Sequence, residues 1–502
     1  MIQDQSRETL EQAARSGDDG ARIELGNRLL SEHRYGSADH ETGLELLKQA
    51  ARGPRAMHAQ WFLGAYFTQV SVRPDAQAQA AQWMGRAADA GFAPALDRLA
   101  DLHLCGAGVE QSAGRALELQ RRLADHGFGR AAWENAYLLS QGVAGPPEAG
   151  AVATAFARAC ALGNLPGYYS LGLRFALGAG VPQDGAFGRA LLLRAADGGF
   201  PDALAAAEEL VPADRHGAGS THWHGALKAN LDAAPLESLA PSRTPVAHGP
   251  VPMVRRLEAH LASVGHPSLQ LDGSGRLACP QVPGGEQSQA QPGQWDWVSG
   301  RPKVGVSRGF ATREECAHLV HKMADSLRHA SEYRRSSSAN DDAEVLYFNG
   351  RGQSVGAMQA DSVVRLIEHR IAGSTGWATE KLETASVIRY QPGEEYRPHV
   401  DFFTREQIAL NRAEGRDFGG QRIATFLLCL RAPELGGETV YENVGLTVRG
   451  EAGTAVLHYN VDPDGEPDQQ SLHSGQPVKI GEKWLWRTTL REHCLHRAAD
   501  PA

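Results

Sequence analysis

Three residues near the C-terminal end of the chain have types and spacing suited to binding one metal ion. His399 and Asp401 stand two residues apart in an apolar, aromatic segment, residues 386–403, that reads as β-strand. Side chains two apart on a strand point to the same face, so both can reach one ion. His473 offers a third ligand. Two histidines and one carboxylate leave three open positions on octahedral Fe(II), enough for a chelating cosubstrate and dioxygen.

The bare spacing of His399 and Asp401 is weak support, because a surface histidine beside an aspartate is the commoner explanation. A second candidate metal pair, His222 and His224, has no third ligand nearby and is better read as loop. Three other histidines in the C-terminal region are not expected to be ligands: His458, His493 and His496. The sequence around His399, Asp401 and His473 therefore decides how these three residues are interpreted.

That setting resembles a known family. His399, Asp401, the turn-like pair at 436–437, His473 and Lys483 follow one another in an order similar to the prolyl 4-hydroxylase-like branch of the Fe(II)- and 2-oxoglutarate-dependent dioxygenases. The resemblance covers about residue 301 to the end. It implies that the two histidines and Asp401 bind Fe(II), and that Lys483 binds the distal carboxylate of 2-oxoglutarate. Without the metal ligands, Lys483 would be a surface lysine lying over neighbouring tryptophans.

The same resemblance assigns further residues. Tyr390 and Thr439 would donate hydrogen bonds to 2-oxoglutarate, or else be a core tyrosine and a turn threonine. Arg491 is eight residues beyond Lys483, so both would face one side of a regular strand. Relatives often have histidine there, which leaves open whether Arg491 contacts the cosubstrate, the incoming peptide or only solvent. Two positions match the substrate groove of relatives: Tyr396 and Arg422.

The implied reaction is decarboxylation of 2-oxoglutarate to succinate and carbon dioxide, coupled through dioxygen to hydroxylation of an unactivated C–H bond. The leading interpretation is a prolyl hydroxylase acting on a peptide or protein, and the resemblance admits ascorbate as an additional cofactor. A second interpretation keeps this chemistry but acts on free proline, another amino acid or a peptide natural product. A third is an interaction scaffold whose oxygenase domain senses oxygen or iron.

Composition bounds the whole chain. Its 502 residues are too many for one ordinary core and predict two or three domains. A net charge of −9 argues against a general nucleic-acid or membrane-surface binder, although residues 334–335 and 412–422 carry arginines that can line a local basic groove. The six cysteines are scattered and no apolar run reaches 18 residues, which predicts a cytoplasmic protein.

The first two hundred residues repeat themselves. Four glycines recur every 36 residues, each after a helical pattern and before another: Gly91, Gly127, Gly163 and Gly199. The pattern resembles an array of Sel-like repeats, relatives of the tetratricopeptide repeat. Such helix pairs need neighbours to bury their apolar faces, and their arrays usually bind a peptide or protein partner. We expect this array to recruit the substrate; the alternative is packing on the catalytic domain or self-association.

The predicted organisation has three parts. Residues 1–210 form an α-solenoid of helix pairs, residues 211–300 a Gly/Pro-rich linker, and residues 301–502 the oxygenase domain. In that last part the resemblance implies a double-stranded β-helix, a jelly-roll barrel with buttressing helices. The first of these helices is expected to begin after Thr312, with Glu315 completing a capping box.

Overall fold

The structure, a computed structural model, describes most of the chain in two compact units. The first unit holds the described helices up to Leu162, and the second holds the described elements from Gly163 onward. The described residues are 6–32, 37–69, 75–181, 183–211, 270–271, 277–278, 294–329, 348–413 and 419–495. In this part of the chain no helix is both long and apolar enough to span a bilayer.

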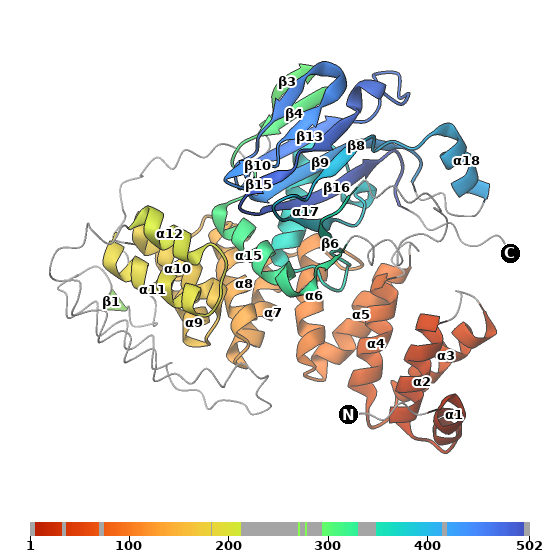
Figure 1. The fold of residues 1–502 in the computed structure, drawn as a ribbon. Helices are drawn as coiled ribbons and strands as arrows, with labels where there is room; N and C mark the ends of the chain where they lie inside the picture. The colour runs from red at the N-terminus through yellow and green to blue at the C-terminus, as the bar shows by residue number, and fades with distance from the viewer. Residues whose placement is uncertain are drawn as a thin grey trace. The chain divides into compact units, whose positions relative to one another are not determined.

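The first unit is helical, and each helix packs on the next one along the chain (Figure 1). Its helices are α1 (Arg7–Arg15), α2 (Asp19–Glu32), α3 (Ala38–Ala50), α4 (Ala56–Gln69), α5 (Ala76–Asp89), α6 (Ala93–Cys105), α7 (Ala113–Asp125), α8 (Gly129–Ser140) and α9 (Ala149–Ala161). Alanine and leucine dominate the buried positions, and small side chains of this kind let the helices approach closely.

The 36-residue glycine period marks helix ends, as the sequence predicts. The glycines follow α5, α7, α9 and α11 (Gly185–Asp197) by two residues, and their φ angles are all positive, at 83°, 88°, 74° and 82°. Glycine occupies this left-handed region without the penalty that a Cβ atom brings, which is why it ends helices. The paired-helix prediction is confirmed.

The last helix pair belongs to the second unit. It consists of α10 (Leu165–Leu177) and α11, followed by the short α12 (Ala203–Leu210). Glu209 of α12 accepts two hydrogen bonds from Arg313, at 2.8 and 2.9 Å, and Arg174 of α10 pairs with Glu314. The division between the two compact units thus falls before the last repeat. The domain limits at residues 210 and 300 remain predictions. A short strand pair falls in the predicted linker: β1 (Gln270–Leu271) and β2 (Leu277–Ala278).

The rest of the second unit consists of antiparallel sheets. The eight-stranded sheet has the order β3-β4-β13-β9-β16-β7-β6-β5, the four-stranded sheet the order β12-β11-β14-β8, and β10 pairs with β15. The strands are β3 (Asp296–Gly300), β4 (Lys303–Ser307), β5 (Arg328–His329), β6 (Arg351–Ser354), β7 (Ser386–Tyr390), β8 (Tyr396–His399), β9 (Arg422–Arg431), β10 (Leu435–Gly436), β11 (Thr439–Tyr441), β12 (Leu446–Val448), β13 (Ala455–Tyr459), β14 (His473–Gly475), β15 (Val478–Ile480) and β16 (Lys483–Arg491).

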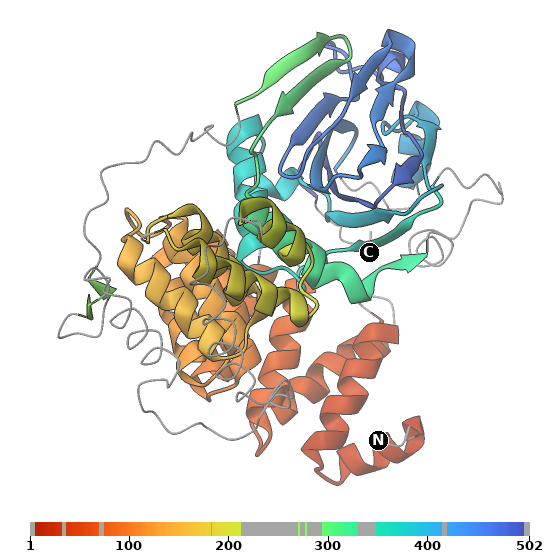
Figure 2. The ribbon, with the colours of Figure 1, turned by 60° about the vertical axis from the view of Figure 1, so that its left-hand side comes forward.

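The two larger sheets share one apolar core, to which the eight-stranded sheet contributes Leu427, Val456 and Leu485, and the four-stranded sheet Tyr441 and Val448. The strands curl around this interior in Figure 2. The predicted class, a helical repeat array followed by a jelly-roll type β domain, is confirmed.

Helices buttress the eight-stranded sheet from outside. They are α15 (Arg313–Met323), which contacts β9, and α17 (Ser362–Thr375). Thr312 and Glu315 form the predicted capping box at the start of α15. Glu315 also accepts two hydrogen bonds from Arg370 of α17, at 2.9 and 3.0 Å, which ties the two helices together. A third helix, α18 (Arg405–Ala413), buries none of its residues.

Candidate metal centre

The two histidines of the predicted metal site lie opposite each other on neighbouring strands. His399 ends β8, and His473 begins β14 as its direct cross-strand partner. Nδ1 of His399 lies 2.8 Å from the Arg397 carbonyl oxygen, and Nδ1 of His473 lies 2.9 Å from the Ser471 carbonyl oxygen. A carbonyl can only accept, so each Nδ1 carries the hydrogen and each Nε2 keeps its lone pair for a metal.

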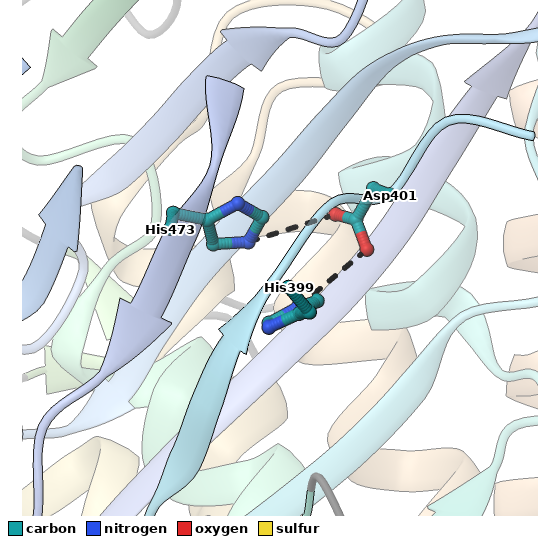
Figure 3. Close-up of side chains that lie close together, drawn as sticks. All are labelled: His399, Asp401 and His473. Carbon is teal, nitrogen blue, oxygen red and sulfur yellow. Dashed lines mark ion pairs between the residues drawn. The ribbon is translucent and has the colours of Figure 1, made fainter. Parts of the chain in front are cut away.

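Asp401 completes the group from the loop that follows β8. The strand ends at His399, so the same-face argument for a continuous strand does not apply to Asp401. The carboxylate nevertheless turns toward the imidazoles, with oxygens 3.7 Å from Nε2 of His399 and 3.8 Å from Nε2 of His473. One ligand atom from each residue lies within 4.8 Å of the others. Figure 3 shows the three side chains converging.

The local electrostatics favour the protonation states that a metal requires. Burial raises the pKa of Asp401, but Arg487 and the surrounding His458, His473 and His399 together outweigh it and hold that pKa well below its usual range. Burial lowers the pKa of His399, and lowers that of His473 further. The carboxylate is therefore anionic and both imidazoles are neutral at neutral pH.

A cavity opens beside this group, and most of the predicted site residues line it: Tyr390, Tyr396, His399, Thr439, His473 and Lys483. Lys483 starts β16 opposite Tyr390 of β7. Its side chain is buried, and its ammonium donates a 2.7 Å hydrogen bond to the Gly437 carbonyl oxygen. Burial lowers the pKa of Lys483. A buried ammonium with so few protein partners is suited to an anionic ligand.

Tyr396 forms a wall of the cavity beside the metal ligands. Its ring stacks on the His399 imidazole, with 3.7 Å between ring centroids and 14° between the planes. Phe348 packs against both Tyr396 and Tyr390, with centroids 5.5 and 5.4 Å apart. This aromatic contact fixes the orientation of the His399 ring.

Arg422 and Arg491 do not line this cavity. They are cross-strand partners at the ends of β9 and β16, and both donate hydrogen bonds to Glu383. Their guanidinium groups lie 4.6 and 5.0 Å from the centroid of the Phe403 ring. The register between β16 and β9 shifts between Leu490 and Arg491, where β9 carries one extra residue, Ile423. Arg491 stands eight residues beyond Lys483, roughly 26 Å along the strand, and this distance takes it out of the cavity that Lys483 lines.

Three further residues surround Asp401: the sequence reasoning missed Arg487 and Thr425, and it named His458 only as a histidine not expected to be a ligand. Arg487 donates a 2.6 Å hydrogen bond to Oδ1, and the Thr425 hydroxyl donates one of the same length to Oδ2. His458 is fully buried, with Nε2 3.6 Å from Oδ2 and Nδ1 hydrogen-bonded to Tyr441. Arg487 stands four residues after Lys483, so the even spacing that drew attention to Arg491 would also have found it.

Several other sequence candidates stay outside this centre. His493 is exposed and lies near Glu492 rather than near the ligands. The pair His222 and His224, His496 and the arginines at 334–335 lie outside the described residues. The residues that do converge fit Fe(II): two neutral imidazole nitrogens and one carboxylate occupy one side of the ion, and the cavity borders the other.

Comparison with known proteins supports this assignment. Residues 385–489 match the 2OG-Fe(II) oxygenase superfamily. Residues 21–53, 58–92, 93–128 and 165–200 match the Sel1 repeat. The chain is 31% identical over 215 residues to probable prolyl 4-hydroxylase 10 of Arabidopsis thaliana, a match that covers 39% of this chain and 71% of the relative. It is 34% identical over 206 residues to prolyl 4-hydroxylase 5 of the same plant, covering 37% and 67%.

Solved structures give matches to both regions. A viral collagen prolyl hydroxylase from Paramecium Bursaria Chlorella virus-1, in complex with 2OG, is 22% identical, with 38% of this chain and 95% of that one covered and a TM-score of 0.29. A Sel1 repeat protein from Oxalobacter formigenes is 23% identical, with 43% and 64% covered and a TM-score of 0.36.

Proposed function

Because this chain belongs to the prolyl 4-hydroxylase family of Fe(II)- and 2-oxoglutarate-dependent dioxygenases, we propose that it hydroxylates a prolyl residue in a peptide or protein. The observation that carries the proposal is the pairing of His399 with His473 across two strands, with Asp401 beside them and Lys483 in the same cavity. A surface histidine beside an aspartate would have neither the cross-strand partner nor the buried lysine.

His399, Asp401 and His473 would hold Fe(II). When bound, the iron supplies the oxidative chemistry by which dioxygen and 2-oxoglutarate yield succinate, carbon dioxide and a hydroxylated substrate. The chain's own part is geometric: backbone carbonyls hold the hydrogen on each Nδ1, and the Thr425 hydroxyl fixes the carboxylate. Such hydrogen bonds orient the ligands before the metal arrives.

Lys483 would bind the distal carboxylate of 2-oxoglutarate at the end of the cavity away from Asp401. Tyr390 and Thr439 line the same cavity and would donate hydrogen bonds to this cosubstrate. Their apolar neighbours Ile388, Leu427 and Leu485 reduce access of water to the bound anion. In such a setting the ion pair with Lys483 is stronger than it would be in bulk solvent.

The peptide would approach from the side of Tyr396. This residue lines the cavity next to His399, and its stacked ring offers a flat apolar surface to a proline. Arg422 lies farther out, with Nη1 3.5 Å from the Asp401 carbonyl oxygen, and would contact the peptide backbone or its flanking residues. Arg491 shares Glu383 with Arg422, so we assign it to the same substrate side.

The repeats would recruit a protein substrate, since arrays of this kind present extended binding surfaces. The test compares the full chain with a chain beginning at Gly163, which keeps α10–α12 and their ion pairs with α15. We expect both chains to turn over short proline peptides equally. On a full-length protein target, the shortened chain should be less efficient than the full chain. If the shortened chain is as efficient as the full chain on both substrates, the repeats serve a separate partner.

Two further features belong to the same proposal. Ascorbate would act as an additional cofactor, and its omission should lower the number of turnovers before inactivation. A cytoplasmic location is supported by five cysteines that are free thiols in the described part of the chain. Exposure of the purified protein to thiol-reactive reagent without reductant would check that these cysteines stay reduced.

The activity test incubates the chain with Fe(II), 2-oxoglutarate and dioxygen in the presence of proline-containing peptides, and in parallel with free proline. We expect a mass increase of one oxygen atom on a prolyl residue, with one succinate formed per hydroxylation. The His399→Ala variant is the control and should give neither product. Hydroxylation of free proline alone would move the substrate class to amino acids, and hydroxylation of neither would reject the proposal.

A further inference from the structure

Two basic side chains occur among the described residues that line the cavity. They are Lys483 and Arg487, both on β16, and none of the lining residues is a carboxylate. Lys483 is 8% exposed, and the Arg487 side chain is 22% exposed. The family resemblance accounts for Lys483 but gives no role to Arg487.

The two cations share a face of their strand. Lys483, Leu485 and Arg487 all line the cavity, as alternate residues of a strand do. Four residues of strand separate the cationic residues by roughly 13 Å between Cα atoms. Both side chains are long, so their charged ends can approach each other across a small dicarboxylate. Arg487 reaches the carboxylate of Asp401, which puts its guanidinium at the metal end of the cavity.

Arg487 is paired with Asp401, at 2.6 Å between Nη2 and Oδ1. A divalent cation bound to Asp401 would take up much of the carboxylate charge. The guanidinium has five N–H donors, and its other nitrogens can then serve a second anion beside the metal. Counting the imidazoles as neutral, the site holds two positive side chains and one negative one, so a bound metal leaves it strongly positive.

We propose that Arg487 binds the metal-proximal carboxylate of 2-oxoglutarate once a metal ion occupies the site. Arg487 and Lys483 then bind opposite ends of the same dicarboxylate, and metal and cosubstrate bind cooperatively. A guanidinium is well suited to this role, because its planar donors match a carboxylate and it stays charged in a buried site. The inference rests on the proposed function only for the identity of the cosubstrate.

The competing role for Arg487 is purely positional. If the guanidinium only held Asp401 in place, its loss would weaken the metal site itself and leave the binding of 2-oxoglutarate to the metal-loaded protein unchanged. The carboxylate-binding role predicts the reverse. Removing a cation from beside a divalent metal lowers electrostatic repulsion, so metal affinity without 2-oxoglutarate should be unchanged or higher.

Calorimetric titrations on the full chain separate these roles, with Mn(II) in place of Fe(II) so that no turnover occurs. The variants are Arg487→Met and Arg487→Lys. The matched control is Arg389→Met, since Arg389 lies on the adjacent strand β7 beside Trp484 and does not line the cavity. Mn(II) is titrated first without 2-oxoglutarate, and 2-oxoglutarate is then titrated into the Mn(II)-loaded protein.

Arg487→Met should raise the Kd for 2-oxoglutarate by about ten- to a hundredfold, the range for one hydrogen-bonded charged partner, without weakening Mn(II) binding. Arg487→Lys should lose less, and Arg389→Met should match the wild type. Weaker Mn(II) binding with an unchanged Kd for 2-oxoglutarate overturns the proposal. So does an unchanged Kd for 2-oxoglutarate with weaker binding of free proline, which would assign Arg487 to a substrate carboxylate. A wild-type protein that binds no 2-oxoglutarate would reject the proposed function itself.

Discussion

Two groups of polar and charged side chains in this chain have different roles, one structural and one chemical. One lies among helices α6, α7 and α8 of the repeats and comprises Asp97, Arg98, Asp101, Gln120, Arg130 and Glu134; we call it the repeat cluster. The other surrounds Asp401 in the β domain. Both contain buried carboxylates beside arginines, and the second borders a cavity lined by two histidines whose Nε2 atoms are available to a metal.

In the repeat cluster, polar groups are directed at one another. Arg98 pairs with Asp97 and Asp101, at 2.9 and 2.8 Å, and Gln120 donates to both Asp97 and Glu134. Burial raises the pKa of Asp97, but Arg130 and Arg98 outweigh it and lower the net value. Neighbouring helices are thereby linked. A buried charge that is paired within such a network indicates structure rather than chemistry.

In the metal centre, backbone carbonyls take up each Nδ1 and leave each Nε2 directed at Asp401 and the cavity. The difference teaches that burial and a shifted pKa do not by themselves identify a functional site. What distinguishes the second group is that two imidazoles and one carboxylate converge beside a cavity. Variants in the two groups should therefore fail in different ways.

The largest effect is expected for the metal ligands. His399→Ala should abolish substrate-dependent succinate formation while leaving the unfolding transition close to that of the wild type. Asp401→Glu should also be severely impaired, because the longer side chain moves the oxygen by more than the roughly ±0.2 Å that ligand distances tolerate. His493→Ala, an exposed histidine outside the group, is the matched control and should keep its activity. Near wild-type turnover by His399→Ala would contradict the metal assignment.

Lys483→Ala should have the next largest effect. The distal carboxylate of 2-oxoglutarate would lose its buried partner, a loss that typically costs about 3–5 kcal/mol. The concentration of 2-oxoglutarate required for half-maximal turnover should rise by about a hundredfold or more. Lys479→Ala, on β15 and exposed, is the control. An unchanged requirement in Lys483→Ala would show that another cation, with Arg487 the nearest candidate in the cavity, binds this carboxylate.

Arg98→Ala tests the repeat cluster. Its removal leaves the carboxylates of Asp97 and Asp101 without their shared arginine, which should lower the free energy of unfolding of the repeats by about 3 kcal/mol. Turnover of short peptides should not change. Arg121→Ala removes an exposed pair with Asp125 and should cost under about 1 kcal/mol. Chemical denaturation of both variants measures the difference, and equal losses would remove the distinction between buried and exposed pairs.

The smallest expected effect concerns pH and Glu383. Burial raises the pKa of Glu383, but Arg422 and Arg491 outweigh it and lower the pKa from 4.5 to about 2. A carboxyl whose pKa is depressed by folding stabilises the protein above its unfolded pKa, and this stabilisation is lost as the pH falls toward the folded value. The free energy of unfolding of the wild type should therefore fall more steeply between pH 4.5 and about 2 than that of Glu383→Gln. Parallel curves would contradict the ion-pair assignment.

The features that sequence predicts well here are local ones. The glycines at a 36-residue period and the capping box of Thr312 and Glu315 depend on backbone geometry within a few residues, and both occur in the structure as expected. The overall class follows from the same kind of pattern. A helical period in one segment, or an alternating period in another, can each be recognised without knowing how the rest of the chain folds.

Predictions about which side chains meet across strands are less secure, because they depend on register. Nothing in the sequence places His473 directly opposite His399, and only the pairing of β14 with β8 does so. The expectation that Arg491 faces the cavity considers only its face of β16 and not its distance from Lys483, and its side chain reaches Glu383 instead. Arg487 obeys the alternation, but it was missed because the resemblance assigns it no role.

Anaerobic binding of Fe(II) and 2-oxoglutarate, followed by visible absorption, tests the central claim most directly because it needs no knowledge of the substrate. Chelation of the metal by 2-oxoglutarate gives a charge-transfer band that neither component gives alone. We predict this band for the wild-type chain only when both components are present, and its loss in His399→Ala and in Asp401→Ala. A wild-type chain that develops no band with both components would contradict the account, as would a band that persists in both variants.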